Sequence, residues 1–463
     1  MLYVDRCRRP QASLHPKTTY PMNLPTPPVS TARDALPKGT PLSAPKTDRR
    51  LVLICGIILL ASLGSVYAWS FFTKPLCESF GWSKMQVSWV FSLAVAGLGL
   101  SAAYTGPKVS KLGSRKLMFR SAAFFAGGYL ISALALYLKN LPLLYLGYGL
   151  IGGIGLGTGY VTGVTTIAGW FPDKKGFATG LVVMGFGIGA LLMSKVIAPY
   201  ALSAANNSLP HTFLFIGLSF CIIMPLACLG IQSPPTATGN GKPATVAETI
   251  QHGPGVQIKL WVVCFLYSLA GLGIISLQSP LFQKIAGDAD PSLDKAVLAA
   301  LGATLIGWTS FSNSVGRLFW ASISDKIGRV NAFIALLATA SAVFLVLPHV
   351  SSPLIYGVLL AYTIASYGGG FGTIPSLISD LYGPKRMSAV HGKILTGWAT
   401  AGLIAPPTFG WLMDKYPNDA ANYAFYACAT VLFLAAILAS TFASLHLKTT
   451  ATPAVDHAAD DPA

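Results

Sequence analysis

Twelve runs of about 20 mostly apolar residues fill most of this sequence. Each run is long enough to cross the roughly 30 Å hydrocarbon core of a bilayer as an α-helix. Backbone groups in lipid must bond within their own segment, so we expect helices, and the alternating pattern of a membrane barrel is missing. Charged residues make up 10% of the chain, against about 25% in soluble domains. The runs are 51–72, 87–106, 117–138, 143–169, 177–199, 213–231, 258–280, 297–320, 331–349, 354–379, 388–412 and 423–446.

The formal charge of +16 comes mainly from one side of the predicted membrane. With the N-terminus placed in the cytoplasm, 23 of the 32 Lys and Arg residues lie on the cytoplasmic side, six on the outer side and three within spans. An excess of Lys and Arg in short cytoplasmic loops sets the orientation of membrane proteins. We therefore expect a multi-pass protein of the plasma (inner) membrane with both termini in the cytoplasm, and no nucleic-acid partner.

The apolar runs fall into two groups of six. A connector that contains Pro and Gly, at 232–257, separates a first six-helix half at 49–231 from a second at 258–447. Residues 1–48 and 448–463 are polar, and we expect cytoplasmic tails there, the first of them disordered.

The loops that follow the second and the eighth runs resemble each other. GPKVSKLGSRK (106–116) and ASISDKIGRV (321–330) align at an offset of 215 residues, which pairs Ser110 with Asp325. The same loop at the same place in each half implies parallel repeats, so we expect an all-α membrane protein of twelve helices in two six-helix halves. The loop residues expected to control conformation are Gly106, Lys111, Gly113, Arg115, Asp325, Lys326, Gly328 and Arg329.

Arg317 places a positive charge deep inside the eighth run. It lies eight residues before Asp325, which is about 12 Å at 1.5 Å per residue. A charge at that depth costs about 2.5–3.5 kcal/mol, so it should face a wet cavity or a partner. The interiors of the spans contain no Asp or Glu, and the planar guanidinium suits a carboxylate, so we expect an incoming anion to bind it. The alternative is an arginine that packs helices together through backbone carbonyls.

Other polar residues near the spans have weaker interpretations. Asn313 lies one turn before Arg317 on the same face and could bond a second substrate oxygen. Tyr160 and Tyr367 fall in mid-span and can offer hydroxyl groups. Near the inner end of the eleventh run, Lys393 is expected to reach the membrane surface. His391 is a possible proton acceptor at a similar depth, but the favoured interpretation is a polar helix-end residue. The cysteine and histidine spacings predict no metal site, and we expect no cofactor.

The whole membrane domain resembles the major facilitator superfamily, and within it the oxalate/formate antiporter and monocarboxylate transporter group. The stretches that carry this resemblance are YAWSFFTKPLCESFGWS (67–83), WFPDKKGFATGLVVMGFGIGA (170–190), NSVGRLFWASISDKIGR (313–329) and YGGGFGTIPSLISDLYG (367–383). Two positions depart from the superfamily's loop motif, since Ser110 replaces the usual acid and Ala321 the usual glycine.

The resemblance implies a substrate site formed by Arg317, Asn313, Tyr160, Tyr367, Trp398 and Tyr67. In that group the arginine of the eighth helix binds the substrate carboxylate. Trp398 stands where oxalate-transporting members hold a second cation, a lysine. One central cation would neutralise only one of the two negative charges of a dianion, so we expect a monocarboxylate such as lactate, pyruvate or formate.

These observations predict a monomeric secondary active transporter in the lipid bilayer, which moves a small organic anion by alternating access. Proton symport, exchange and facilitated diffusion stay open. The glycine run YGGGFG (367–372) weakens its helix by about 1 kcal/mol per glycine, so we expect a bending point there. The alternatives are an oxalate/formate-type exchanger, a transporter of neutral or cationic compounds, and a carboxylate sensor that does not transport. An enzyme is disfavoured, because no nucleophile–base pair stands out and GIGLGTG follows no strand.

Overall fold

The computed structural model describes residues 48–234, 253–416 and 419–442. This part of the chain is helical almost throughout and contains no strand. The predicted tails and most of the predicted connector lie outside the described residues. The helices α1–α10 are called the first half below, and α11–α16 the second half.

In the first half, six predicted runs become helices that are broken in places by short 3-10 or π segments. The elements are α1 (Arg49–Gly64), η1 (Ser65–Ala68), α2 (Trp69–Phe80), α3 (Lys84–Thr105), η2 (Gly106–Lys108), α4 (Val109–Leu112), α5 (Ser114–Tyr137), α6 (Leu141–Leu144), η3 (Tyr145–Gly152), α7 (Gly153–Trp170), α8 (Lys175–Leu192), η4 (Met193–Ile197), α9 (Ala198–Ala204) and α10 (Leu209–Gly230).

The second half has fewer breaks and longer helices. Its elements are α11 (Pro254–Ala289), α12 (Lys295–Ile327), α13 (Arg329–Val346), η5 (Leu347–His349), α14 (Pro353–Tyr382), α15 (Pro384–Lys415) and α16 (Ala420–Ser440). The 36 residues of α11 and the 33 of α12 exceed the predicted spans, because both helices continue past the apolar stretch into polar sequence. Across 367–372 the glycine run of α14 forms an uninterrupted helix, so the helix is not broken at the predicted bending point in this conformation.

Ten helical segments of the described residues are long and apolar enough to cross a membrane. The other two predicted spans lie in α12 and α15, which have the length but carry more polar side chains. The all-α fold of twelve membrane-crossing helices is therefore confirmed, and its two least apolar helices are the ones that carry Arg317 and Trp398.

The two equivalent loops share one backbone conformation. Gly113 and Gly328, which the offset of 215 residues aligns, have φ angles of +80° and +88°. Glycine adopts such positive values without the steric cost that a side chain brings. Each glycine directly precedes a helix, α5 in the first half and α13 in the second.

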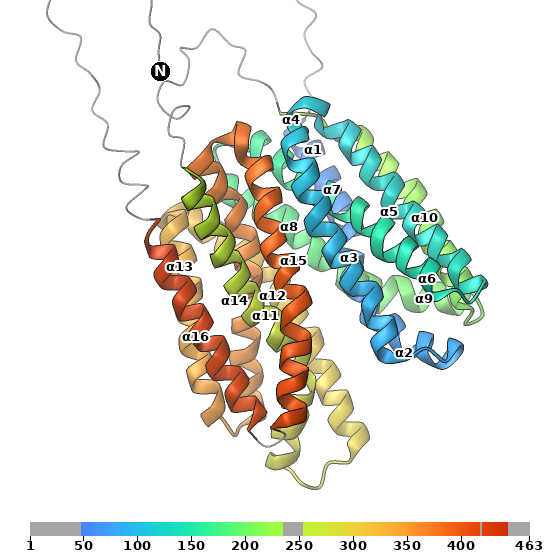
Figure 1. The fold of residues 1–463 in the computed structure, drawn as a ribbon, viewed down its shortest axis with the longest axis vertical. Coiled ribbons are helices and arrows are strands. Elements are labelled where there is room, and N and C mark those ends of the chain that lie inside the picture. Colours follow the sequence, from blue (N-terminus) through green and yellow to red (C-terminus); the bar gives the residue numbers. More distant parts are fainter. Residues whose placement is uncertain (1–47, 235–252, 417–418, 443–463) are drawn as a thin grey trace, which may run out of the picture. The chain divides into compact units, whose positions relative to one another are not determined.

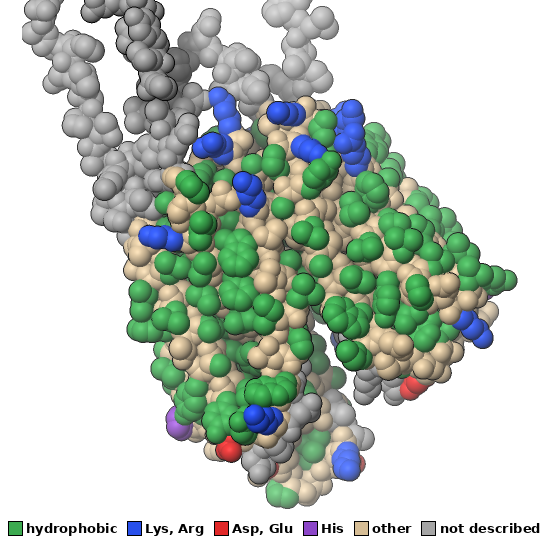
Figure 2. Space-filling model, viewed as in Figure 1, with side chains coloured by type: hydrophobic (Ala, Val, Ile, Leu, Met, Phe, Trp, Pro, Cys, Tyr) green, Lys and Arg blue, Asp and Glu red, His purple; other side chains and the backbone are tan. Residues whose placement is uncertain are grey.

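The two halves meet where α3 packs on α15 and where α8 packs on two helices of the second half. In Figure 1 the first half runs from blue to green, the second from yellow to red, and α3 lies beside α15. At the second contact, α8 packs against α12 and α14. Figure 2 shows apolar side chains over the flank of the bundle and Lys and Arg gathered at one end. We call this end the basic end; its exposed cations include Lys111, Arg115, Lys116, Arg120, Lys174, Lys385 and Arg386.

Candidate functional site

Arg317 is buried in the middle of α12, with 4% of its surface exposed. Its Nε donates to Oδ1 of Asn313 at 3.0 Å, one turn earlier on the same helix. Its Nη1 donates to the carbonyl oxygen of Val183 on α8 at 3.2 Å, across the boundary between the halves. The ion pairs of the described residues do not include Arg317. The guanidinium is therefore held by neutral oxygens, which leave its charge uncompensated.

The guanidinium borders a small cavity between the two halves. The first half contributes Tyr67, Leu98, Tyr160 and Phe186, and the second half contributes Arg317, Phe371, Leu395 and Trp398. Apart from Arg317 the lining is aromatic or aliphatic, with tyrosine and tryptophan as its polar members. A single buried cation in such a wall favours a ligand with one anionic group and an apolar remainder.

Aromatic rings connect the two halves around the cavity. The ring centre of Tyr67 lies 5.3 Å from that of Phe186 and 6.4 Å from that of Trp398. The guanidinium carbon of Arg317 lies 5.9 Å from the ring centre of Phe186 and 5.6 Å from that of Phe371. Cations are attracted to ring faces at such distances. The rings thus provide part of the stabilisation that a buried cation needs.

Four of the six predicted site residues line this cavity, and the other two support them. Arg317, Tyr160, Tyr67 and Trp398 line it. Asn313 lies outside the lining, and its Oδ1 accepts a hydrogen bond from Nε of Arg317. Tyr367 accepts a hydrogen bond of 3.0 Å from Nε1 of Trp398, so the indole N–H is already engaged and Trp398 presents mainly apolar surface.

The structure also brings residues to the site that the sequence did not single out. Phe186, Phe371, Leu98 and Leu395 line the cavity, but their residue types are common in every span. His391 is buried, with 1% of its surface exposed. The interpretation of His391 as a polar helix-end residue is wrong, because α3 and α7 pack against α15 at this position.

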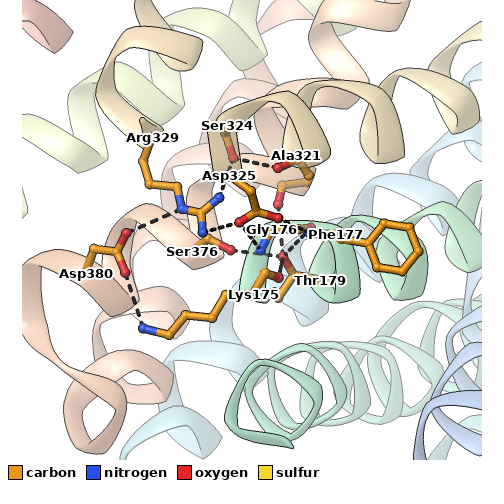
Figure 3. Close-up of polar contacts among 11 residues, drawn as sticks. Lys175, Gly176, Phe177, Thr179, Ala321, Ser324, Asp325, Arg329, Ser376 and Asp380 are labelled. Carbon is orange, nitrogen blue, oxygen red and sulfur yellow. Dashed lines mark hydrogen bonds and ion pairs between the residues drawn. The ribbon is translucent and has the colours of Figure 1, made fainter. Parts of the chain in front are cut away.

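Asp325, from the second loop motif, joins the halves at the basic end. Its carboxylate accepts hydrogen bonds from the backbone N–H groups of Gly176 at 3.1 Å and Phe177 at 2.8 Å, in the first turn of α8. An acid at a helix N-terminus bonds free amides and complements the helix dipole. Because Asp325 belongs to α12, this cap attaches the second half to the first (Figure 3).

Three further charged residues extend this cap. Arg329 forms ion pairs with Asp325 and, at 3.3 Å, with Asp380. Lys175 on α8 pairs with Asp380 on α14 at 3.3 Å, again between the halves. We call Lys175, Asp325, Arg329 and Asp380 the basic-end network (Figure 3). One turn deeper, Thr179 and Ser376 share a hydrogen bond of 3.0 Å.

The first copy of the loop motif has no equivalent ionic cap. Ser110 occupies the position of Asp325 and is exposed. The motif's Arg115 donates instead to the carbonyl oxygen of Ile231, within the first half, at 2.8 Å. On this side the halves are joined by close packing, because a Cβ on Gly106 would meet the carbonyl oxygen of Ser388 on α15. The motif lysines Lys111 and Lys326 are exposed.

Comparison with known proteins identifies the family to which this chain is similar. Residues 54–406 match the model of the Major Facilitator Superfamily. The oxalate:formate antiporter of Oxalobacter formigenes is 26% identical over 416 residues, which cover 85% of this chain and 91% of that protein. Monocarboxylate transporter 2 of Mesocricetus auratus is 24% identical over 400 residues, which cover 81% and 80% of the two chains.

A solved structure supports the same assignment at the level of the fold. The structure of FucP, a Major Facilitator Superfamily transporter in the outward conformation, has a TM-score of 0.65 to this chain at 16% identity. It covers 85% of this chain and 98% of that one. The family match and the two relatives confirm the resemblance to the oxalate/formate antiporter and monocarboxylate transporter group, and the chain belongs to the major facilitator superfamily of membrane transporters.

Proposed function

We propose that this transporter carries a small monocarboxylate and that the carboxylate pairs with Arg317. The observation that carries the proposal is a buried guanidinium, held by neutral oxygens, at a cavity between the two halves. A carboxylate would supply the missing negative charge and two acceptors for a planar donor. Hydrogen bonds to charged groups contribute about 1.5–3 kcal/mol each.

The lining of the cavity supports one carboxylate rather than two. Arg317 is the cation of the cavity wall that the described residues form. Trp398, at the position where the resemblance places a lysine, donates its N–H to Tyr367 and offers apolar surface. A second carboxylate there would be desolvated without a partner, whereas an apolar tail gains about 0.8 kcal/mol per buried CH₂. Lactate, pyruvate and similar short acids have this form.

The contacts between the halves support alternating access. We propose that the basic end faces the cytoplasm, in agreement with the positive-inside rule, and that both termini lie there in a plasma membrane. In this conformation the basic end is closed by the basic-end network and by the packing of α3 on α15. Transport would require these contacts to separate while the opposite end closes.

Uptake of labelled lactate, pyruvate, formate and oxalate into proteoliposomes tests the proposal. We expect Arg317→Ala to lose lactate and pyruvate uptake, and Arg317→Lys to recover little of it, because an ammonium cannot make the planar two-bond contact. Lys393→Ala is the matched control, since Lys393 is an exposed cation of α15 and its removal should leave uptake unchanged. Lactate uptake that survives Arg317→Ala would remove Arg317 as the anchor.

A second candidate is exchange of oxalate for formate, which the name of the antiporter relative suggests. The same assay separates the two functions. Oxalate exchange as strong as lactate uptake would refute the argument from a single cation. Binding of lactate without transport, in vesicles that hold correctly inserted protein, would favour a sensor.

A further inference from the structure

His391 is a buried residue of α15 whose imidazole lies beside the substrate cavity. It lies on α15, seven residues before Trp398. Among the described residues its Nδ1 has no hydrogen-bond partner, and the same holds for the hydroxyl of Tyr160. The ring centres of His391 and Tyr160 are 5.9 Å apart. Burying a polar group without a partner costs about 1–3 kcal/mol, and here two such groups are neighbours.

Tyr160 connects His391 with the substrate cavity. Tyr160 lines the cavity together with Arg317, while His391 lies beside it and outside the lining. On its other side, Gly392 packs so closely on α3 that a Cβ there would meet the carbonyl oxygen of Ala102. His391 therefore lies between the cavity and the contact of α3 with α15, which must separate if the basic end opens.

Tyr160 of α7 is a titratable side chain found against the imidazole. Lys393, two residues further along α15, is exposed. The other titratable residues on elements packed against α15 include Tyr104 on α3, Lys108 on η2, Lys111 on α4, Lys259, Cys264, Tyr267, Lys284 and, in the last turn, Asp288 on α11, Tyr356, Tyr362, Tyr367, Asp380 and Tyr382 on α14, and Tyr423, Tyr426 and Cys428 on α16. Among these, Asp380 is paired with Arg329 and Lys175. A proton on His391 would therefore meet no protein counter-charge.

We infer that His391 binds the proton that travels with the carboxylate, so that the protein is a proton–monocarboxylate symporter. The inference rests on the proposed function, because the anion in the cavity supplies the counter-charge. Imidazole is the side chain whose ordinary titration falls between pH 5 and 8. An anion near it stabilises the protonated form, and by linkage the protonated form strengthens anion binding by the same factor.

Charge accounting supports the same assignment. The empty cavity carries the positive charge of Arg317, and a bound monocarboxylate would reduce the total to zero. One proton on His391 restores the positive charge, so that the loaded and the empty protein change conformation with the same net charge. Moving one charge through 100 mV costs about 2.3 kcal/mol. Transport of the proton together with the carboxylate moves no net charge, so the transport cycle does not include this cost.

A route for the proton follows from the positions of the two side chains. In this conformation neither group has a hydrogen-bond partner among the described residues, so the transfer requires the Tyr160 hydroxyl and the imidazole to move into hydrogen-bond contact. The hydroxyl then donates its own proton to the imidazole and accepts one from the cavity. Separation of α3 from α15 then exposes His391 at the basic end, where the imidazole releases the proton. No covalent bond other than O–H and N–H is made or broken.

Two transport modes of the same proteoliposomes test the assignment. In the first, an inward proton gradient drives accumulation of labelled pyruvate; about two pH units would support up to about 100-fold accumulation in one-to-one symport. In the second, exchange of labelled for unlabelled pyruvate needs no net proton movement. We expect His391→Gln to retain exchange and to lose gradient-driven accumulation. His211→Gln is the control, because His211 is an exposed histidine bonded to Ser208 at the start of α10.

The outcomes distinguish this inference from the proposed function. Exchange in His391→Gln shows that the variant is folded and binds substrate. Accumulation that persists in His391→Gln at the wild-type level would overturn the assignment while leaving carboxylate transport intact. Wild-type exchange without any gradient-driven accumulation would also overturn it. Absence of both modes in the wild type would instead refute the proposed function.

Discussion

Removal of the Asp325 carboxylate should open the basic end of the transporter. In Asp325→Ala the two backbone N–H groups at the start of α8 lose their acceptor in the second half. An acidic N-cap contributes about 0.5–2 kcal/mol and the helix dipole about 0.3–1 kcal/mol. The side chain is 22% exposed, so water will replace part of the loss, and we expect a net change of about 1–2 kcal/mol. This corresponds to an increase of about 5–30-fold in the population that is open at the basic end.

A buried reporter at the other contact between the halves measures that population. Ser388 is 4% exposed and lies against Gly106, where α15 packs on the first half. In Ser388→Cys the thiol should react with a water-soluble maleimide only when the basic end opens. If opening and closing are faster than labelling, the labelling rate follows the open population. We expect Asp325→Ala to raise this rate about 5–30-fold.

Ser110→Ala is the matched control for this measurement. Ser110 occupies the equivalent place in the first loop and is exposed, so its removal should leave the labelling rate unchanged. Equal rates in wild type, Ser110→Ala and Asp325→Ala would show that the cap of α8 does not hold the halves together. A comparable increase in both variants would assign the effect to the loops in general.

Two further substitutions test the packing of the halves and the selectivity of the cavity. At Gly180 a Cβ would lie 2.7 Å from the Cβ of Ala321, so Gly180→Ala should push α8 away from α12, lower the free energy of unfolding by about 1–3 kcal/mol and slow uptake. Gly127→Ala is the control, because no atom lies within 4 Å of a Cβ there, and it should be neutral or stabilising. Equal behaviour of the two variants would refute the close-packing argument. In Trp398→Lys a second cation faces the cavity, and the ratio of oxalate to lactate uptake should rise about 10–150-fold for a contact of about 1.5–3 kcal/mol; an unchanged ratio would show that the alignment of the eleventh span is wrong.

The spans and the buried cation could be predicted from the sequence because both depend only on which residues occur within one continuous stretch of the chain. A run of about 20 apolar residues has few alternatives to a membrane helix, and a charge within it is visible at once. Depth along the helix placed Arg317 near the middle of the membrane, and the structure shows it buried at a cavity. The repeat was detectable because Gly113 and Gly328 need the same backbone conformation.

The direction in which each side chain points could not be predicted in the same way. In soluble helices an apolar face marks the core, but a membrane helix is apolar all round, so Phe186 and Phe371 could not be distinguished from residues that face lipid. Counting from the helix end placed His391 near the surface, yet its burial depends on α3 and α7, which lie far away in the sequence. Asn313 lies on the predicted face, but Arg317 already engages its oxygen.

With the carboxylate bound as we propose, the position of Arg317 would couple the substrate directly to the boundary between the halves. The guanidinium makes one of the hydrogen bonds that join α12 to α8, through the carbonyl oxygen of Val183. A carboxylate is a stronger acceptor for a cationic donor than a neutral carbonyl is, so a bound anion competes with Val183 for the guanidinium. Binding then weakens one attachment of α8 at the cavity, while Asp325 still caps its first turn at the basic end. In alternating access the ligand must interact differently with the two conformations, and here the residue that we propose to bind the ligand also contributes to the contact that has to separate.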